Sequence, residues 1–204
     1  MRTKSTPNPW VAIWTRPRAT IQQIVDANSE HLVIMLAAIS GLIRAANQFR
    51  TEGLGDPSEW LTKILIAAMV APIIGIIMLF IGGGLIRWTG SWIGGNASSQ
   101  NIRAAMAWSS VPIIWGLILW IPGLALFGQD FFATETPTIA ANPLLAFIRI
   151  GFSMIEITIG LWAVVVFLKC LGQVQGFSAW KALGNTLLAG FFITIPISVL
   201  GILI

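Results

Sequence analysis

Long apolar runs alternate with short polar segments along most of the chain. Each run approaches the 20 or so residues that a helix needs to cross the roughly 30 Å hydrocarbon core of a bilayer. We therefore predict an all-α, polytopic membrane protein with five transmembrane helices, preceded by a short interfacial amphipathic helix. The predicted spans cover residues 32–49, 61–86, 104–127, 144–168 and 182–204.

The segment before the first predicted span has a different pattern. Trp10 and Trp14 lie between basic side chains, and Ile21, Ile24 and Val25 share one helical face. This pattern is typical of an amphipathic helix at the membrane surface, anchored by tryptophans. An ordinary juxtamembrane tail is the alternative. The predicted domains are a cytoplasmic tail with an interfacial helix, residues 1–31, and a transmembrane domain, residues 32–204.

Composition excludes several classes of protein. The chain is 56% hydrophobic and only 10% charged, far more apolar than a soluble core of this size requires. Its formal charge is +4, but the basic residues form no single cluster, so we expect the lipid bilayer and not nucleic acid as a partner. One cysteine, Cys170, and one histidine, His31, offer no disulfide and no metal cage, and we expect neither a cofactor nor an enzyme.

The basic residues instead follow the predicted topology. The tail and the second and fourth loops carry Arg2, Lys4, Arg16, Arg18, Arg87, Arg103, Lys169 and Lys181. The other two loops and their edges carry Arg50, Lys63 and Arg149, together with Glu52, Asp56, Glu59, Asp130 and Glu135. Because cytoplasmic loops are enriched in Lys and Arg, this alternation predicts a cytoplasmic N-terminus and an extracytoplasmic C-terminus.

A glutamate, Glu156, lies near the middle of the fourth predicted span. Arg149, Ser153 and Glu156 follow helical steps of four and three, so they share one face. A carboxylate inside the hydrocarbon region costs a few kcal/mol, and it requires a partner, a proton or a water-filled recess.

The first predicted span offers the complementary charge in Arg44. Ser40, Arg44 and Asn47 form a polar stripe at helical spacing, and we predict that Arg44 pairs with Glu156. Two interpretations of the pair remain open. It forms part of an ion or proton path or a polar substrate recess, or it is a structural pair that neutralises two buried charges and fixes helix register.

Two rows of small residues indicate helix–helix contacts. Ala37, Gly41 and Ala45 lie on the first span, and Gly190, Thr194 and Ser198 lie on the fifth. Small side chains at this spacing let membrane helices approach closely, so we expect partner helices or self-association.

Two stretches, taken with the topology, resemble the Yip domain family of membrane proteins, named for interaction with Ypt/Rab GTPases. The first runs from Asn8, Pro9 and Trp10 to Pro17, and is similar to the opening of prokaryotic members. The second, residues 105–112, enters the third span and is similar to the family's aromatic-small-aromatic-Ser-x-x-Pro signature, through Trp108, Ser109, Ser110 and Pro112.

The resemblance implies a prokaryotic cytoplasmic-membrane protein. Eukaryotic relatives act in vesicle traffic and carry a Tyr-Gly-Pro-type motif before the first span; this chain has no such motif, so a Rab-type GTPase is not an expected partner. The leading hypothesis is a non-enzymatic membrane adaptor or organising factor that works through helix–helix contacts with itself or with another membrane protein. The alternative is a small channel or permease with a polar site at Arg44 and Glu156.

Overall fold

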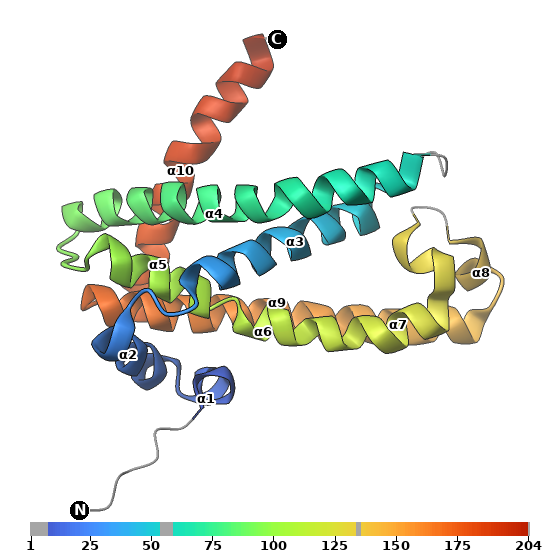
Figure 1. The fold of residues 1–204 in the computed structure, drawn as a ribbon, viewed down its shortest axis with the longest axis horizontal. Coiled ribbons are helices and arrows are strands. Elements are labelled where there is room, and N and C mark those ends of the chain that lie inside the picture. Colours follow the sequence, from blue (N-terminus) through green and yellow to red (C-terminus); the bar gives the residue numbers. More distant parts are fainter. Residues whose placement is uncertain (1–7, 54–58, 134–135, 204) are drawn as a thin grey trace, which may run out of the picture. The chain divides into compact units, whose positions relative to one another are not determined.

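A computed structural model of the chain describes residues 8–53, 59–133 and 136–203, and in these ranges every regular element is a helix (Figure 1). Arg2, Lys4, Asp56 and Glu135, which entered the predicted charge pattern, lie outside the described residues. The elements are α1 Pro9–Thr15, α2 Pro17–Asn28, α3 Val33–Glu52, α4 Trp60–Trp92, α5 Ser99–Trp108, α6 Val111–Gly116, η2 Leu117–Leu119, α7 Trp120–Phe127, η3 Gly128–Phe132, α8 Pro137–Ala140, α9 Pro143–Gln175 and α10 Ala179–Leu203.

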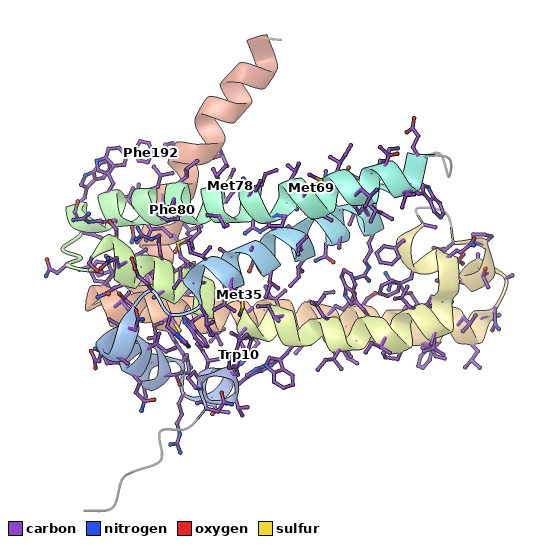
Figure 2. All side chains as sticks on the ribbon, viewed as in Figure 1. Trp10, Met35, Met69, Met78, Phe80 and Phe192 are labelled. Carbon is purple, nitrogen blue, oxygen red and sulfur yellow. The ribbon has the colours of Figure 1, made fainter. Side chains whose placement is uncertain are left out.

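Within the described residues, three segments are long and apolar enough to cross a membrane: Trp60–Trp92, Ser99–Phe132 and Pro143–Gln175. They correspond to the second, third and fourth predicted spans. Large apolar side chains such as Met69 and Met78 stay exposed along α4, as expected of a surface that faces lipid (Figure 2). The first and fifth predicted spans are not among the three. The charged and amide side chains of α3 lower its hydropathy, and the side chains of α10 from residue 195 onward lie outside the description.

The helices form two compact units. The first consists of Met1–Ile34, Ile77–Ser109 and Val164–Ile204, and the second of Met35–Ile76 and Ser110–Ala163. Each unit is described separately below.

In the first unit, α2 packs its apolar face against α5. Ile21 and Ile24 on that face are buried, and so is Ile102 on α5. The predicted amphipathic helix is present, but its apolar face packs against protein and not against lipid. Hydrogen bonds also join α2 to the end of α9: the Gln173 amide donates to Gln22 at 3.1 Å, and the Cys170 thiol donates to the Pro17 carbonyl at 3.7 Å.

The interior of the first unit also holds a buried polar cluster. The Thr89 hydroxyl donates to Asn185 Oδ1 at 2.6 Å, and the Asn185 amide donates to the Ile86 carbonyl at 3.0 Å. Buried polar groups need such partners, so α4 and α10 are held in one register. Nearby, the buried Gln175 fills the space beside Gly90 and Gly95, where an added Cβ would meet its amide oxygen.

In the second unit, α3 and the start of α4 approach closely enough to exclude side chains. A Cβ on Gly41 would lie 2.1 Å from the Ala71 carbonyl oxygen, and one on Gly75 would lie 2.3 Å from the Ala37 carbonyl oxygen. The small-residue row that we predicted on the first span is therefore used within the chain, against α4. It leaves no free surface at Gly41 for a partner helix.

The second unit also contains an interrupted helical stretch and a small aromatic core. Pro112 lies in the first turn of α6, and the 3₁₀ turn η2 separates α6 from α7. After α7 the chain turns at Gly128, which has a φ of 53°, a conformation that favours glycine. The following 3₁₀ turn, η3, then packs Phe131 against Phe127 and Ile139.

Candidate intramembrane polar site

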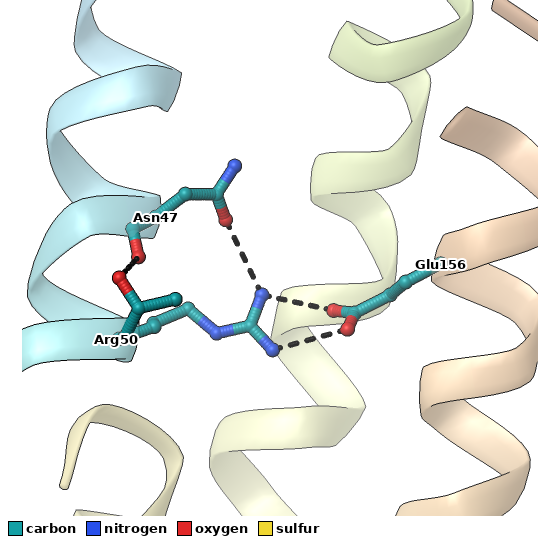
Figure 3. A network of polar contacts seen from close by, with 4 residues as sticks. Asn47, Arg50 and Glu156 are labelled. Atoms are coloured by element: carbon teal, nitrogen blue, oxygen red, sulfur yellow. Dashed lines mark hydrogen bonds and ion pairs between the residues drawn. The ribbon is translucent and has the colours of Figure 1, made fainter. Parts of the chain in front are cut away.

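Glu156 on α9 forms an ion pair with Arg50 on α3, inside the second unit (Figure 3). Arg50 Nη1 lies 2.9 Å from Oε1, and Nη2 donates to Oε2 at 3.2 Å, so the pair is bidentate. The Arg50 side chain is 10% exposed and that of Glu156 is 28% exposed. The expectation that this carboxylate requires a cation from a neighbouring helix is therefore met.

The identity of that cation corrects our prediction, because the partner is Arg50 and not Arg44. The helix α3 continues to Glu52, beyond the predicted end at residue 49, so Arg50 lies inside its last turn. Six residues at 100° each separate Arg44 from Arg50 by more than a right angle around the helix. Arg44 is exposed and makes no ion pair with any described residue.

Aromatic rings surround the Arg50 guanidinium. Its central carbon lies 4.3 Å from the ring centroid of Phe131 and 5.4 Å from that of Trp120. Asn47, one turn earlier on α3, accepts a hydrogen bond from Arg50 Nη1 at 3.5 Å. The cation is thus held by a carboxylate, an amide and two π faces, an arrangement that suits the weakly hydrated guanidinium.

Arg149 reaches the same aromatic cluster from α9. Its guanidinium carbon lies 5.6 Å from the Phe127 centroid and 5.9 Å from the Phe131 centroid. Among the described residues it has no ion-pair partner, and its Nη1 is buried without a hydrogen bond.

The other predicted polar residues divide between the site and its surroundings. Asn47 joins the site through Arg50, as described above. Ser153 is half-buried on α9, and no hydrogen bond links it to the ion pair in the described structure. Ser40 donates to the carbonyl of Leu36 in its own helix at 2.7 Å, so it takes no part.

Besides Arg50, the site contains residues that the sequence did not identify as candidates: Trp120, Phe131 and Asp130. Asp130 is buried, and its carboxylate accepts from the backbone N–H of Ile139 at 2.9 Å and from the Thr138 hydroxyl at 3.3 Å. It thereby ties η3 to the start of α8 and fixes the ring of Phe131 beside the two arginines. The available signal was an acidic residue directly before two phenylalanines, in a loop without Lys or Arg.

In the first unit, the structure brings together the two stretches that carried the family resemblance. Asn8 caps α1 by accepting from the Trp10 N–H at 3.0 Å, and Pro9 occupies the first turn. The Trp10 ring then meets the buried Trp108 ring at 5.7 Å. Trp108 Nε1 donates to the carbonyl of His31 at 3.2 Å. These two tryptophans therefore pack the N-terminal helices onto α5.

The remaining residues of the second stretch turn the chain out of α5. The buried Ser109 follows Trp108 and donates to the Met106 carbonyl at 2.7 Å, while Ser110 and Pro112 begin α6. A model of the Yip1 domain matches residues 11–201. The chain belongs to the Yip1 domain family. The matched region includes the whole polar site and the Trp108–Pro112 stretch, and it begins just after Trp10. Searches of curated proteins and of solved structures found no match.

Proposed function

We propose that this Yip1 domain protein is a non-enzymatic membrane adaptor or organising factor that works through contacts between its own helices and those of a partner. The partner is a second copy of the chain or another membrane protein. The observation that carries the proposal is the mutual neutralisation of the two charges of the polar site. Arg50 and Glu156 neutralise each other, and the Arg50 guanidinium lies against the Phe131 ring, as expected of a structural pair.

The contact surface in this proposal is the face of α10 that contains Gly190. An added Cβ at Gly190 would meet nothing within 4 Å, and Thr194, one turn later, is exposed. The neighbouring Leu187 and Phe191 are exposed as well. This row contrasts with the row around Gly41, which α4 already occupies. An open row of small residues supports close approach of another membrane helix.

Crosslinking in native membranes tests this proposal. We expect the wild type to crosslink to itself or to a second membrane protein, and Gly190→Leu to reduce the yield several-fold, because the bulky side chain prevents close approach. The matched control is Gly151→Leu on α9, where an added Cβ also meets nothing within 4 Å. Recovery of monomer alone, or equal losses in the two variants, would refute the proposal.

A five-span topology with a cytoplasmic N-terminus and an extracytoplasmic C-terminus, in a prokaryotic cytoplasmic membrane, forms part of the proposal. An exposed aromatic cluster supports the position of the inner interface: the ring centroids of Trp88 and Trp92 are 4.4 Å apart, and they lie 5.0 and 5.7 Å from that of Phe192. Tryptophans gather at membrane interfaces. Reporter enzymes fused to each terminus provide the test, and a C-terminal reporter active only in the cytoplasm would contradict the topology.

The second candidate function is a small channel or permease, favoured by one observation. Arg149 lies inside a candidate membrane span, and no carboxylate of the described residues pairs with it. Intramembrane charges of this kind often mark a pathway. Ion flux into liposomes that contain the purified protein distinguishes the two functions. Flux through the wild type that Glu156→Gln abolishes without loss of folding would establish a channel or permease in place of the adaptor.

A further inference from the structure

Two arginines of the polar site of the second unit lie against one aromatic ring. Arg50 and Arg149 both place their guanidinium carbons against Phe131, at 4.3 and 5.9 Å from its centroid. The separation of the two guanidinium carbons is therefore no larger than the sum of these distances. Glu156 pairs with Arg50, and no described carboxylate pairs with Arg149.

Each of the two guanidiniums also has a buried donor without an acceptor. These donors are Arg50 Nε and Arg149 Nη1, and neither makes a hydrogen bond. Nine-tenths of the Arg50 side chain is buried. Buried donors are almost always paired, so two unpaired ones in a single cluster indicate that an acceptor belongs there.

The nearest other carboxylate does not supply that acceptor. Asp130 lies next to Phe131 in the chain, but its two oxygens accept from Ile139 N–H and from the Thr138 hydroxyl. It forms no ion pair with either arginine in the described structure. Asp130 thus satisfies neither of the two unpaired guanidinium donors, and Arg149 has no ion-pair partner among the described residues.

We propose that Arg50 and Arg149 together bind a phosphate group, with Glu156 acting as an internal competitor for Arg50. The planar guanidinium fork matches the geometry of a phosphate, which is negatively charged and presents several acceptor oxygens to unpaired N–H donors. Arg50 lies two residues before the end of α3, and Arg149 lies about 9 Å along α9 from Pro143. Both are near helix ends, where lipid phosphates lie, and a soluble phosphate reaches the same level from water.

The test measures phosphate binding by purified protein in two arms. In the first, inorganic phosphate is titrated into delipidated protein in neutral detergent. In the second, the protein is placed in nanodiscs of phosphatidylcholine with increasing phosphatidylglycerol, and retained lipid is counted by native mass spectrometry. Binding in the first arm identifies a soluble ligand, and binding confined to the second identifies a lipid headgroup. Absence of binding in both arms would overturn the proposal.

Three variants separate a binding site from general charge attraction. Arg149→Gln should weaken binding at least tenfold, whereas Arg44→Gln, which removes an exposed arginine from α3, should leave it unchanged. Glu156→Gln should tighten binding several-fold, because it releases Arg50 from its internal partner. A purely structural pair would give no such increase. Equal losses of phosphate binding in Arg149→Gln and Arg44→Gln would overturn the proposal. If Arg149→Gln fails to fold, Glu156→Gln remains as the test, and unchanged or weaker phosphate binding by that variant would overturn the proposal.

This inference is independent of the proposed contacts of α10. It is measured on isolated protein, so loss of crosslinking at Gly190 does not affect it. It also requires no flux, so a phosphate-binding protein that transports nothing would support it and leave the adaptor proposal standing.

Discussion

The rings of Trp10 and Trp108 meet edge to face, with centroids 5.7 Å apart and planes inclined by 65°. One tryptophan comes from α1 and the other from α5, and Trp108 is only 1% exposed. The two stretches of the Yip1 domain resemblance thus form a single packed contact. Because such edge-to-face pairs add about 0.5–1.5 kcal/mol beyond their buried area, the contact stabilises the N-terminal helices on the first unit.

The Trp108 ring should be the most sensitive position of this contact. Trp108→Ala is expected to lower the free energy of unfolding by about 3–5 kcal/mol, the usual cost of removing a large buried aromatic side chain. Trp108→Phe should cost less, since it mainly removes the hydrogen bond to the His31 carbonyl. Trp180→Ala, at an 82% exposed tryptophan, is the control and should change stability little. Denaturation in detergent provides the measurement, and equal losses at Trp108 and Trp180 would contradict this packing.

The thiol of Cys170 should be shielded by α2. It is buried and donates to the Pro17 carbonyl, so maleimide should label it slowly in native membranes. Ile21→Asp places a charge in the buried face of α2 and should increase the labelling rate at least tenfold by detaching that helix. Ala19→Asp, on the exposed face of the same helix, should leave the rate unchanged. Fast labelling of the wild type would show that α2 does not cover this site.

The close approach of α3 and α4 should tolerate no added methyl group. Gly41→Ala and Gly75→Ala are each expected to destabilise the protein by about 1–3 kcal/mol, because the new Cβ would meet backbone carbonyl oxygens. Gly84→Ala on α4 meets nothing within 4 Å, so the better helix propensity of alanine should make it neutral or slightly stabilising. Thermal unfolding of the three variants measures the difference. Equal melting temperatures for Gly41→Ala and Gly84→Ala would argue against the contact.

Replacing one partner of the Arg50–Glu156 pair should lower the free energy of unfolding more than replacing both. Glu156→Gln leaves a buried guanidinium without its carboxylate, and we expect a loss of about 3 kcal/mol. Replacement of both residues, Arg50→Met with Glu156→Leu, should recover most of that loss, since no buried charge is then left uncompensated. Arg44→Gln should have almost no effect. A double variant that loses the sum of the two single losses would show that the residues act independently.

That Glu156 requires a cation was predictable from the sequence, but which arginine provides it was not. A carboxylate at position 156 requires a cation because burial penalises its charge wherever the helices lie. Which arginine provides that cation depends on where α3 ends and on how it is rotated against α4. The rotation depends on the tertiary contacts at Gly41 and Gly75, which the apolar pattern does not encode.

The dependence on tertiary contacts also explains the other differences between the sequence predictions and the structure. The three apolar runs centred on α4, the α5–η3 stretch and α9 were recognised, because hydropathy over 20 residues is a local property. The apolar face of α2 was also recognised, but periodicity cannot distinguish a face covered by lipid from one covered by α5. Phe131 and Asp130 were missed because their roles depend on a short turn that folds back on Arg50 and Arg149, which no local pattern predicts.

The attachment of α2 to the end of α9 has a consequence for biosynthesis. The contacts of Arg18, Gln22 and Pro17 are with Phe177, Gln173 and Cys170, partners more than 150 positions later in the chain. The first helices to leave the ribosome therefore have no complete docking surface until translation has passed residue 177. Closure of the N-terminal helices onto the end of α9 is thus a late event, which follows synthesis of every earlier helix.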